Sequence, residues 1–256
     1  VVRGRVAVAD GAIAGVLFDD RDAAVPDPPA AQVIDCEGRY LAPGFIDGHL
    51  HIESSNVRPA EYARMALARG TTTAIADSIN YIDTARAYTV SESWIGQSLE
   101  ELGLRDEFVL ATKCRALTAE DMRAFMGEHP GEVFGLGEMM NYPGVEAADA
   151  ETLARIDAAA ATVSGVVDGH APLVVGADLN AYVASGVIAD HECTGPEEAL
   201  DKLSRGMYIM LREGTCSHDL EALSPVVLEN PLRARRCCFA TDDRAPSDAL
   251  PIGMID

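Results

Sequence analysis

Residues 43–51 read Pro43-Gly44-Phe45-Ile46-Asp47-Gly48-His49-Leu50-His51, an apolar run that closes on two histidines. Side chains two positions apart on a β-strand point to the same side of it, so His49 and His51 present two imidazoles together. Two imidazoles placed in this way can share a metal ion. The polar residues Glu53-Ser54-Ser55-Asn56 follow and indicate that a buried strand ends here. Two unrelated surface or core histidines are the alternative interpretation of this pair.

Strand-like and helix-like segments alternate from Tyr40 onward, which indicates βα units and a parallel sheet. We predict as many strands as close a barrel: Phe45–His51, Thr71–Asp77, Glu107–Lys113, Glu132–Gly137, Gly165–His170, Val187–His191, Met207–Leu211 and Cys237–Thr241. We predict helices at Pro59–Ala68, Ser91–Leu102, Ala119–Glu128, Ala148–Ala161, Ala177–Ala184, Pro196–Ser204 and near Asp219–Leu223, and none after the last strand. In residues 1–40 we predict strands at Arg5–Ala9, Ala12–Phe18 and Gln32–Cys36.

The composition limits the classes of partner and compartment. A net charge of −21 over 256 residues excludes nucleic-acid and anionic-membrane partners, because phosphates would be repelled. No apolar run approaches the ~20 residues that a membrane span requires. The six cysteines show no C-x-x-C spacing and are interpreted as reduced thiols, which predicts a cytoplasmic protein. A small-molecule substrate fits this composition, and the sequence is compatible with a homo-oligomer.

Polar residues follow several of the predicted strands, and all are of the types that bind metals. They are His49 and His51, Glu138, Asp168 and His170, Asp190 to Glu192, and Asp242 with Asp243. In a barrel of parallel strands these ends meet at one mouth, where barrel chemistry gathers. Taken singly, each has another explanation, such as a helix N-terminal carboxylate or a cap.

Imidazoles combined with carboxylates suit zinc, iron, manganese or cobalt better than calcium or magnesium. Four imidazoles and two carboxylates would converge on this mouth, more than one tetrahedral ion with an open position uses, so we predict two ions bridged by a carboxylate. A nearby aspartate can accept the proton of an activated water and return it to a leaving group.

The run Pro43 to His51 resembles the metal signature of the amidohydrolase superfamily. The phrases Gly137-Glu138-Met139-Met140-Asn141, Asp168-Gly169-His170-Ala171-Pro172 and Asp190-His191-Glu192-Cys193-Thr194 are similar to those of its adenine deaminases, and the resemblance covers residues 1–77 and 116–256. It implies a metal ligand set of His49, His51, Glu138, His170, His191 and Asp242. The implied cofactors are two divalent transition-metal ions, manganese or iron, with zinc as a further candidate.

The same resemblance implies a reaction and two catalytic residues. Glu138 would bridge the two ions, and Asp242 would shuttle the proton. Hydroxide held by the metals would attack C6 of adenine, a small purine substrate, and give hypoxanthine and ammonia.

Residues 79–114 depart from that pattern and resemble a βαβ segment of the aldo-keto reductases. In that family's terms Asp83, Tyr88 and Lys113 match three members of a catalytic tetrad, with Lys113 lowering the pKa of Tyr88. Ser78-Ile79-Asn80 stands where adenine deaminases carry Pro-His-Glu. Two alternative functions follow: a chimeric barrel that binds metal only, and an NADPH-dependent reductase.

We therefore predict an α/β fold in two parts. Residues 41–256 form a TIM (β/α)₈ barrel of metal-dependent hydrolase type, truncated at its C-terminal end and containing the reductase-like segment 79–114. Residues 1–40 form a small β-rich piece, part of a composite domain. The predicted function is metal-dependent deamination of adenine.

Overall fold

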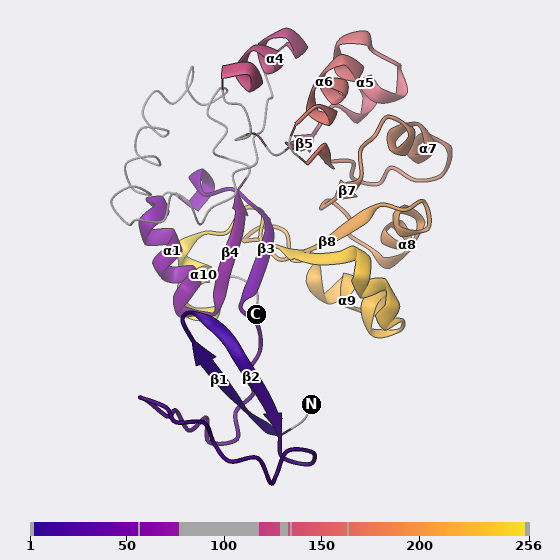
Figure 1. Ribbon diagram of the computed structural model, residues 1–256. Coiled ribbons are helices and arrows are strands. Elements are labelled where there is room, and N and C mark those ends of the chain that lie inside the picture. The colour runs from indigo at the N-terminus through magenta and orange to yellow at the C-terminus, as the bar shows by residue number, and fades with distance from the viewer. Residues whose placement is uncertain are drawn as a thin grey trace. The chain divides into compact units, whose positions relative to one another are not determined.

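The computed structural model describes residues 3–55, 57–76, 118–128, 133, 135–162 and 164–253. The chain divides into two compact units, Val1–Pro43 and Gly44–Asp256 (Figure 1). The predicted strand Glu107–Lys113, the predicted helix Ser91–Leu102 and the reductase-like residues 79–114 lie outside the described residues.

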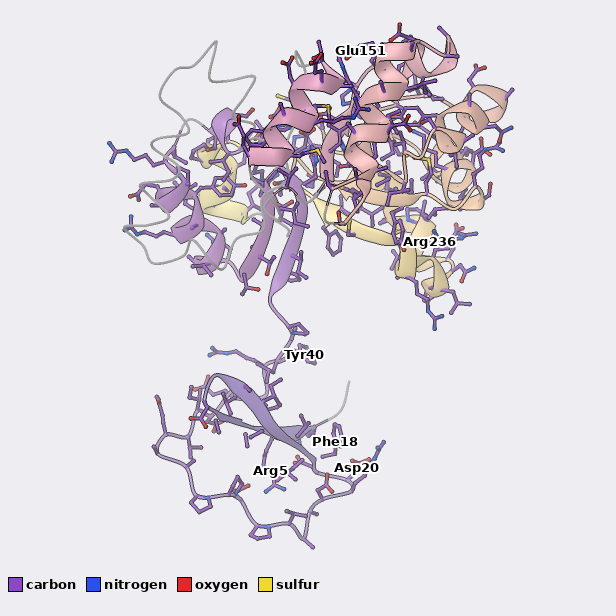
Figure 2. The ribbon with its side chains drawn as sticks, turned by 45° about the horizontal axis from the view of Figure 1, so that its top comes forward. Arg5, Phe18, Asp20, Tyr40, Glu151 and Arg236 are labelled. Carbon is purple, nitrogen blue, oxygen red and sulfur yellow. The ribbon has the colours of Figure 1, made fainter. Side chains whose placement is uncertain are left out.

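The first unit is built on an antiparallel hairpin of β1 (Gly4–Ala9) and β2 (Ala12–Phe18). Both residues of its Asp10-Gly11 turn have positive φ, of 50° and 75°, as a tight hairpin turn requires. Phe18 closes the second strand, and Arg5 of the first strand forms an ion pair with Asp27 of the following loop (Figure 2). The two predicted strands of the hairpin are confirmed.

The third strand predicted for this unit, Gln32–Cys36, is wrong. These residues form no β-ladder in the described part of the chain, and Val33 and Ile34 are exposed. An apolar, β-branched run becomes a strand only where another backbone pairs with its N–H and C=O groups.

The second unit holds a parallel sheet whose strands run in the spatial order β4-β3-β9-β8-β7, and a parallel pair β5-β6. Their bounds are β3 (Phe45–Leu50), β4 (Thr71–Ala76), β5 (Gly135–Met139), β6 (Val166–Gly169), β7 (Ala189–Asp190), β8 (Tyr208–Arg212) and β9 (Cys237–Ala240). The amide of Ile188, just before β7, donates to Val167 O of β6 at 3.0 Å and joins the two sets.

The resulting neighbour order, β4-β3-β9-β8-β7-β6-β5, is that of a (β/α)₈ barrel in which each strand lies beside the next one along the chain. Along the chain, residues 77–117 between β4 and α4 lie outside the described ranges. The parallel α/β architecture predicted from the alternating segments is confirmed. Its consequence for function is that the carboxyl ends of all these strands face one side.

Helices follow the strands along the chain (Figure 1). They are α1 (Pro59–Ala68), α4 (Ala119–Glu128), α5 (Tyr142–Glu146), α6 (Ala150–Ala160), α7 (Gly176–Ala184), α8 (Pro196–Ser204), α9 (Leu220–Leu228) and α10 (Pro246–Ile252), with short 3₁₀ turns at Glu53–Ser55 and Pro231–Arg236. Three of them, α1, α4 and α8, have the predicted bounds. None of the helices in the described ranges is long and apolar enough to cross a membrane.

Two predictions about helices are corrected by the structure. The single predicted helix Ala148–Ala161 begins two residues later as α6, because Ala148 has φ +52° and Asp149 caps α6 by accepting from Thr152 N. The expected absence of a helix after the last strand is also wrong, since α10 forms there. Its Pro246 occupies the first turn, where a missing N–H costs nothing, and its Ala249 is buried in the apolar cluster around α1.

The largest apolar cluster lies between β5, β6 and the helices that cover them. It includes Leu136, Val167, Leu179 and Tyr182, the last two fully buried on α7. Burying side chains of this size contributes roughly 1.5–3 kcal/mol each, so the outer helices are firmly attached to the strands. The strand ends, and the residues that follow them, are therefore held by a packed scaffold.

Candidate metal centre

All six predicted ligands come from the carboxyl ends of the described strands. His49 lies in β3 and His51 follows it, Glu138 lies in β5, and His170, His191 and Asp242 follow β6, β7 and β9. Five of these side chains are buried and His170 is half-buried. Buried ionisable groups gathered in this way require charge partners or a metal.

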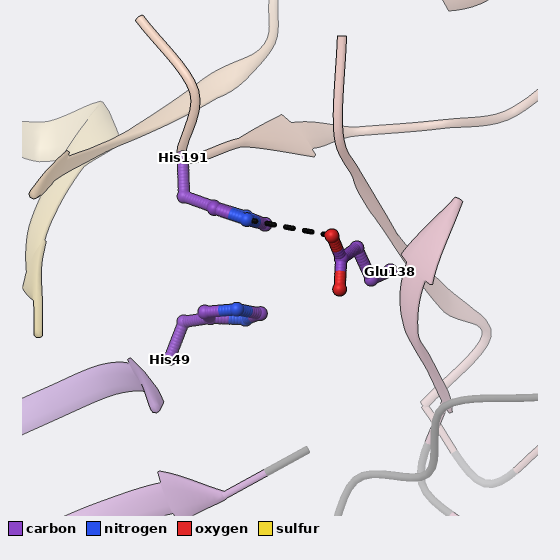
Figure 3. Close-up of side chains that lie close together, drawn as sticks. All are labelled: His49, Glu138 and His191. Atoms are coloured by element: carbon purple, nitrogen blue, oxygen red, sulfur yellow. Dashed lines mark ion pairs between the residues drawn. The ribbon is translucent and has the colours of Figure 1, made fainter. Parts of the chain in front are cut away.

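Two imidazoles and a carboxylate form one group at the centre of this cluster (Figure 3). The rings of His49 and His191 are stacked, with centroids 3.9 Å apart and planes 22° apart. His191 Nε2 lies 3.8 Å from Glu138 Oε1, and one ligand atom from each of the three residues falls within 4.8 Å of the others. A single cation could contact all three side chains.

A second group shares His49 with the first. His51 Nε2 lies 3.0 Å from Asp242 Oδ1, and His49 Nε2 lies 3.9 Å from the same oxygen. A third group joins His191 and His170 to Glu192, whose Oε1 lies 3.6 Å and 3.7 Å from their ring nitrogens. His170 also forms an ion pair with Glu138. The site thus consists of overlapping groups of three rather than a single set.

The surroundings of Asp242 and Asp168 shift the pKa values of these two carboxyl groups in opposite directions. Burial alone would raise the pKa of the Asp242 carboxyl, but the hydrogen bond from His51 and the charges of His49, His51 and Arg212 lower it to about 2. Burial raises the pKa of Asp168 to about 6, against the opposing hydrogen bond with His49. Asp242 is therefore ionised at neutral pH and available as a ligand or as a proton acceptor.

The pKa values of His170 and His191 shift in opposite directions. Burial and the neighbouring imidazoles lower the pKa of His191 well below 6.5, which keeps this ring neutral. Burial would lower the pKa of His170 as well, but the hydrogen bond and charge of Glu138 outweigh it and raise that pKa. A neutral imidazole is the form that binds a metal.

Residues around the six hold the ligands in place. Asp168 Oδ2 lies 3.4 Å from His49 Nδ1 and 3.8 Å from His191 Nδ1, the carboxylate position that fixes metal-binding histidines. Asp47, fully buried on β3, accepts from Thr241 N at 3.0 Å and from Thr241 Oγ1 at 2.6 Å. These bonds tie β3 to the residue that follows β9.

The ligand set inferred from the sequence leaves out three residues that the structure brings to the site. Asp168 and Glu192 stand two positions before His170 and one after His191, so their proximity to those histidines was a usable signal. Arg212 ends β8 and donates from Nη1 to Asp242 Oδ2 at 3.1 Å, while its Nε donates to Asp219 Oδ2 at 2.9 Å. It also pairs with Glu192.

The donor set fits a transition metal. It combines imidazoles with carboxylates, which suit zinc, iron, manganese or cobalt. His191 Nδ1 is buried and has no hydrogen-bond partner among the residues that the structure describes, a costly arrangement for an imidazole without a metal on its ring. The residues present therefore match the group that the sequence implies.

Comparison with known proteins shows the family of this chain. Residues 40–249 match the amidohydrolase family. The chain belongs to that family. The resemblance noted in the sequence is thereby confirmed, and a divalent metal centre is a property of the family that the clustered histidines and carboxylates fit.

Curated relatives of this amidohydrolase carry the name adenine deaminase. The protein from Desulfatibacillum aliphaticivorans is 42% identical over 265 residues, which cover 100% of this chain and 44% of that protein. Adenine deaminase 2 of Carboxydothermus hydrogenoformans is 41% identical and covers 100% and 43%. The protein of Methanoculleus marisnigri is 45% identical and covers 87% and 42%. The chain spans less than half the length of these relatives.

A solved structure supports the fold independently. The crystal structure of an uncharacterized protein superposes with a TM-score of 0.52 over 95% of this chain and 74% of that one, at 16% identity. The comparisons favour neither alternative function, and Asp83, Tyr88 and Lys113, which suggested a reductase, lie outside the described residues.

Proposed function

We propose that this chain binds two divalent transition-metal ions and hydrolyses adenine to hypoxanthine and ammonia. The observation that carries the proposal is the overlap of two buried groups, His49 with Glu138 and His191, and His49 with His51 and Asp242. One shared imidazole between two groups of three supports two ions close together. The names of the relatives supply the substrate.

The proposed ligands are the six strand-end residues, divided by their contacts. His49, His51 and Asp242 would hold one ion, and His170 and His191 the other, with Glu138 between them. Glu138 is suited to bridging because it forms one group with His49 and His191, which belong to different ions. Manganese or iron are the proposed ions, and zinc would suit the same donors.

The chemistry divides between the metals and the chain. Bound divalent ions lower the pKa of water and so supply a nucleophile near neutral pH. Asp242 is kept ionised by His51 and Arg212, so it can accept a proton from the water and deliver it to the departing amine. A bond forms between the water oxygen and C6 of adenine, the C6–N6 bond breaks, and N6 leaves as ammonia.

The surroundings fit a small neutral base as substrate. A chain of net charge −21 repels phosphorylated compounds, so free adenine suits it better than a nucleotide. The described cysteines Cys36, Cys193, Cys216, Cys237 and Cys238 are free thiols. Free thiols support a reducing compartment, and we propose the cytoplasm.

The decisive experiment measures ammonia released from adenine by the chain reconstituted with Mn²⁺ or Fe²⁺, together with its metal content. We expect turnover and about two ions per chain. His49→Ala should lose both, because His49 belongs to two groups. His218→Ala is the matched control, since His218 is exposed and its ring pairs with Glu213, which is not a proposed ligand. A folded chain that retains no metal and releases no ammonia would refute the proposal.

A further inference from the structure

Tyr182 joins two ligand-bearing segments through a single oxygen. This residue lies on α7, outside the strands, and is fully buried. Its hydroxyl donates to Met139 O at 2.8 Å and accepts from His170 N at 3.0 Å. Met139 is the neighbour of Glu138 along β5, so one hydroxyl links the backbone beside the proposed bridging carboxylate to the backbone of a proposed histidine ligand.

The space around this hydroxyl allows little displacement. A Cβ atom placed on Gly169, next to His170, would lie 2.9 Å from Tyr182 Oη and 2.4 Å from Ala189 O. The segment that carries His170 therefore packs directly against both the tyrosine and β7. Its position depends on contacts that tolerate shifts of only a few tenths of an ångström.

The segment after His170 is tied a second time, from the next helix. Lys202 of α8 donates to Ala171 O and to Asp190 Oδ2, both at 2.7 Å. Asp190 Oδ1 in turn accepts from Ala171 N at 2.9 Å, and Asp190 immediately precedes His191. Tyr182 therefore connects the neighbour of Glu138 to the backbone of His170. Lys202 connects the neighbour of His170 to the neighbour of His191.

We propose that Tyr182 is a positioning residue of the metal centre, which sets the spacing of Glu138 and His170 through their backbones. This inference rests on the proposed function, because it concerns the same ligands. The hydroxyl contacts the main chain on both sides, so it acts through the backbone positions of the residues that would bind metal.

The test is a titration with Co²⁺, which follows binding and coordination geometry by its visible absorption. Tyr182→Phe removes one oxygen and keeps the ring, so the chain should fold. We expect its Co²⁺ dissociation constant to rise about tenfold, the lower end of what supporting contacts contribute, and the visible bands to change shape. Neither readout depends on turnover.

Leu179→Val is the matched control, because Leu179 is equally buried on the same helix and belongs to the same apolar cluster. It should lower the melting temperature of the metal-free chain while leaving Co²⁺ affinity and spectrum unchanged. Equal loss of Co²⁺ affinity in both variants, or no loss in Tyr182→Phe, would overturn this inference and leave the proposed function standing. A wild-type chain that binds no Co²⁺ would overturn the proposed function and this inference with it.

Discussion

Replacing Lys202 by Met should destabilise the chain more than any exposed charge replacement on the same helix. The ammonium of Lys202 is fully buried and donates to three oxygens: Ala171 O, Asp190 Oδ2 and, at 2.6 Å, Glu198 Oε1. Methionine fills a similar volume but offers no donor. Two carboxylates and a carbonyl would then stay buried without their cation.

The magnitude follows from the cost of leaving a buried ion without its partner, about 3–5 kcal/mol. Domains of ordinary stability have about 5–15 kcal/mol in total, so this is a large share. For a chain of this size, each kcal/mol lowers the melting temperature by about 2–4 °C, which gives a decrease of roughly 6–20 °C.

Urea unfolding of the metal-free proteins, followed by circular dichroism, measures the free-energy difference directly. Arg205→Met is the control, because Arg205 follows the last residue of α8 and pairs with Asp201 of that helix in partial contact with solvent. That change should cost at most about 1 kcal/mol. The reasoning fails if Lys202→Met unfolds at the same urea concentration as Arg205→Met.

Three further predictions concern the pH dependence, the metal and the backbone. The pKa of the Asp168 carboxyl is raised from 3.8 to about 6 in the folded chain, so folding is coupled to the binding of its proton. The stability that this proton contributes is lost as the pH rises through 6. Lowering the pH from 7 to 5 should therefore raise the free energy of unfolding of the metal-free wild type by about 1 kcal/mol more than that of Asp168→Asn, as measured by urea titration. The same pH profile in both proteins would contradict this. Removing metal with a chelator should lower the melting temperature by about 5–11 °C from a state saturated at 100 times the dissociation constant. His49→Ala should melt at one temperature with or without chelator, because His49 belongs to both metal-binding groups. Gly169→Ala should lower the free energy of unfolding by about 1–3 kcal/mol, because the new Cβ would lie 2.4 Å from Ala189 O. Gly127→Ala, in an open helical position, should raise it by about 0.5–1 kcal/mol. Equal urea midpoints for the two variants would show the packing argument to be mistaken.

Local patterns predicted much of the fold because they reflect local physics. Pro59 and Pro196 open α1 and α8 in the first turn, where proline's missing N–H costs nothing, and the bounds of both helices are as predicted. The hairpin follows from Asp10-Gly11 in the same way. Errors arose where local and distant effects compete: Gln32–Cys36 has strand-forming residues but no described neighbour to pair with, and Pro251 obscured α10.

The polar residues that end each strand can be identified from the sequence, because they follow apolar runs. The parallel arrangement of the strands then places them at one mouth of the barrel. The sequence alone therefore determined the metal-binding types and their common side of the barrel. Which of them touch was decided by packing between segments far apart: the stacked His49 and His191, Asp168 beside both, and Arg212 on Asp242. Tyr182 belongs to this second class. Its spacing from the ligands along the chain carries no signal, because hydrogen bonds from α7 to β5 and to the residue after β6 depend on the three-dimensional position of one oxygen.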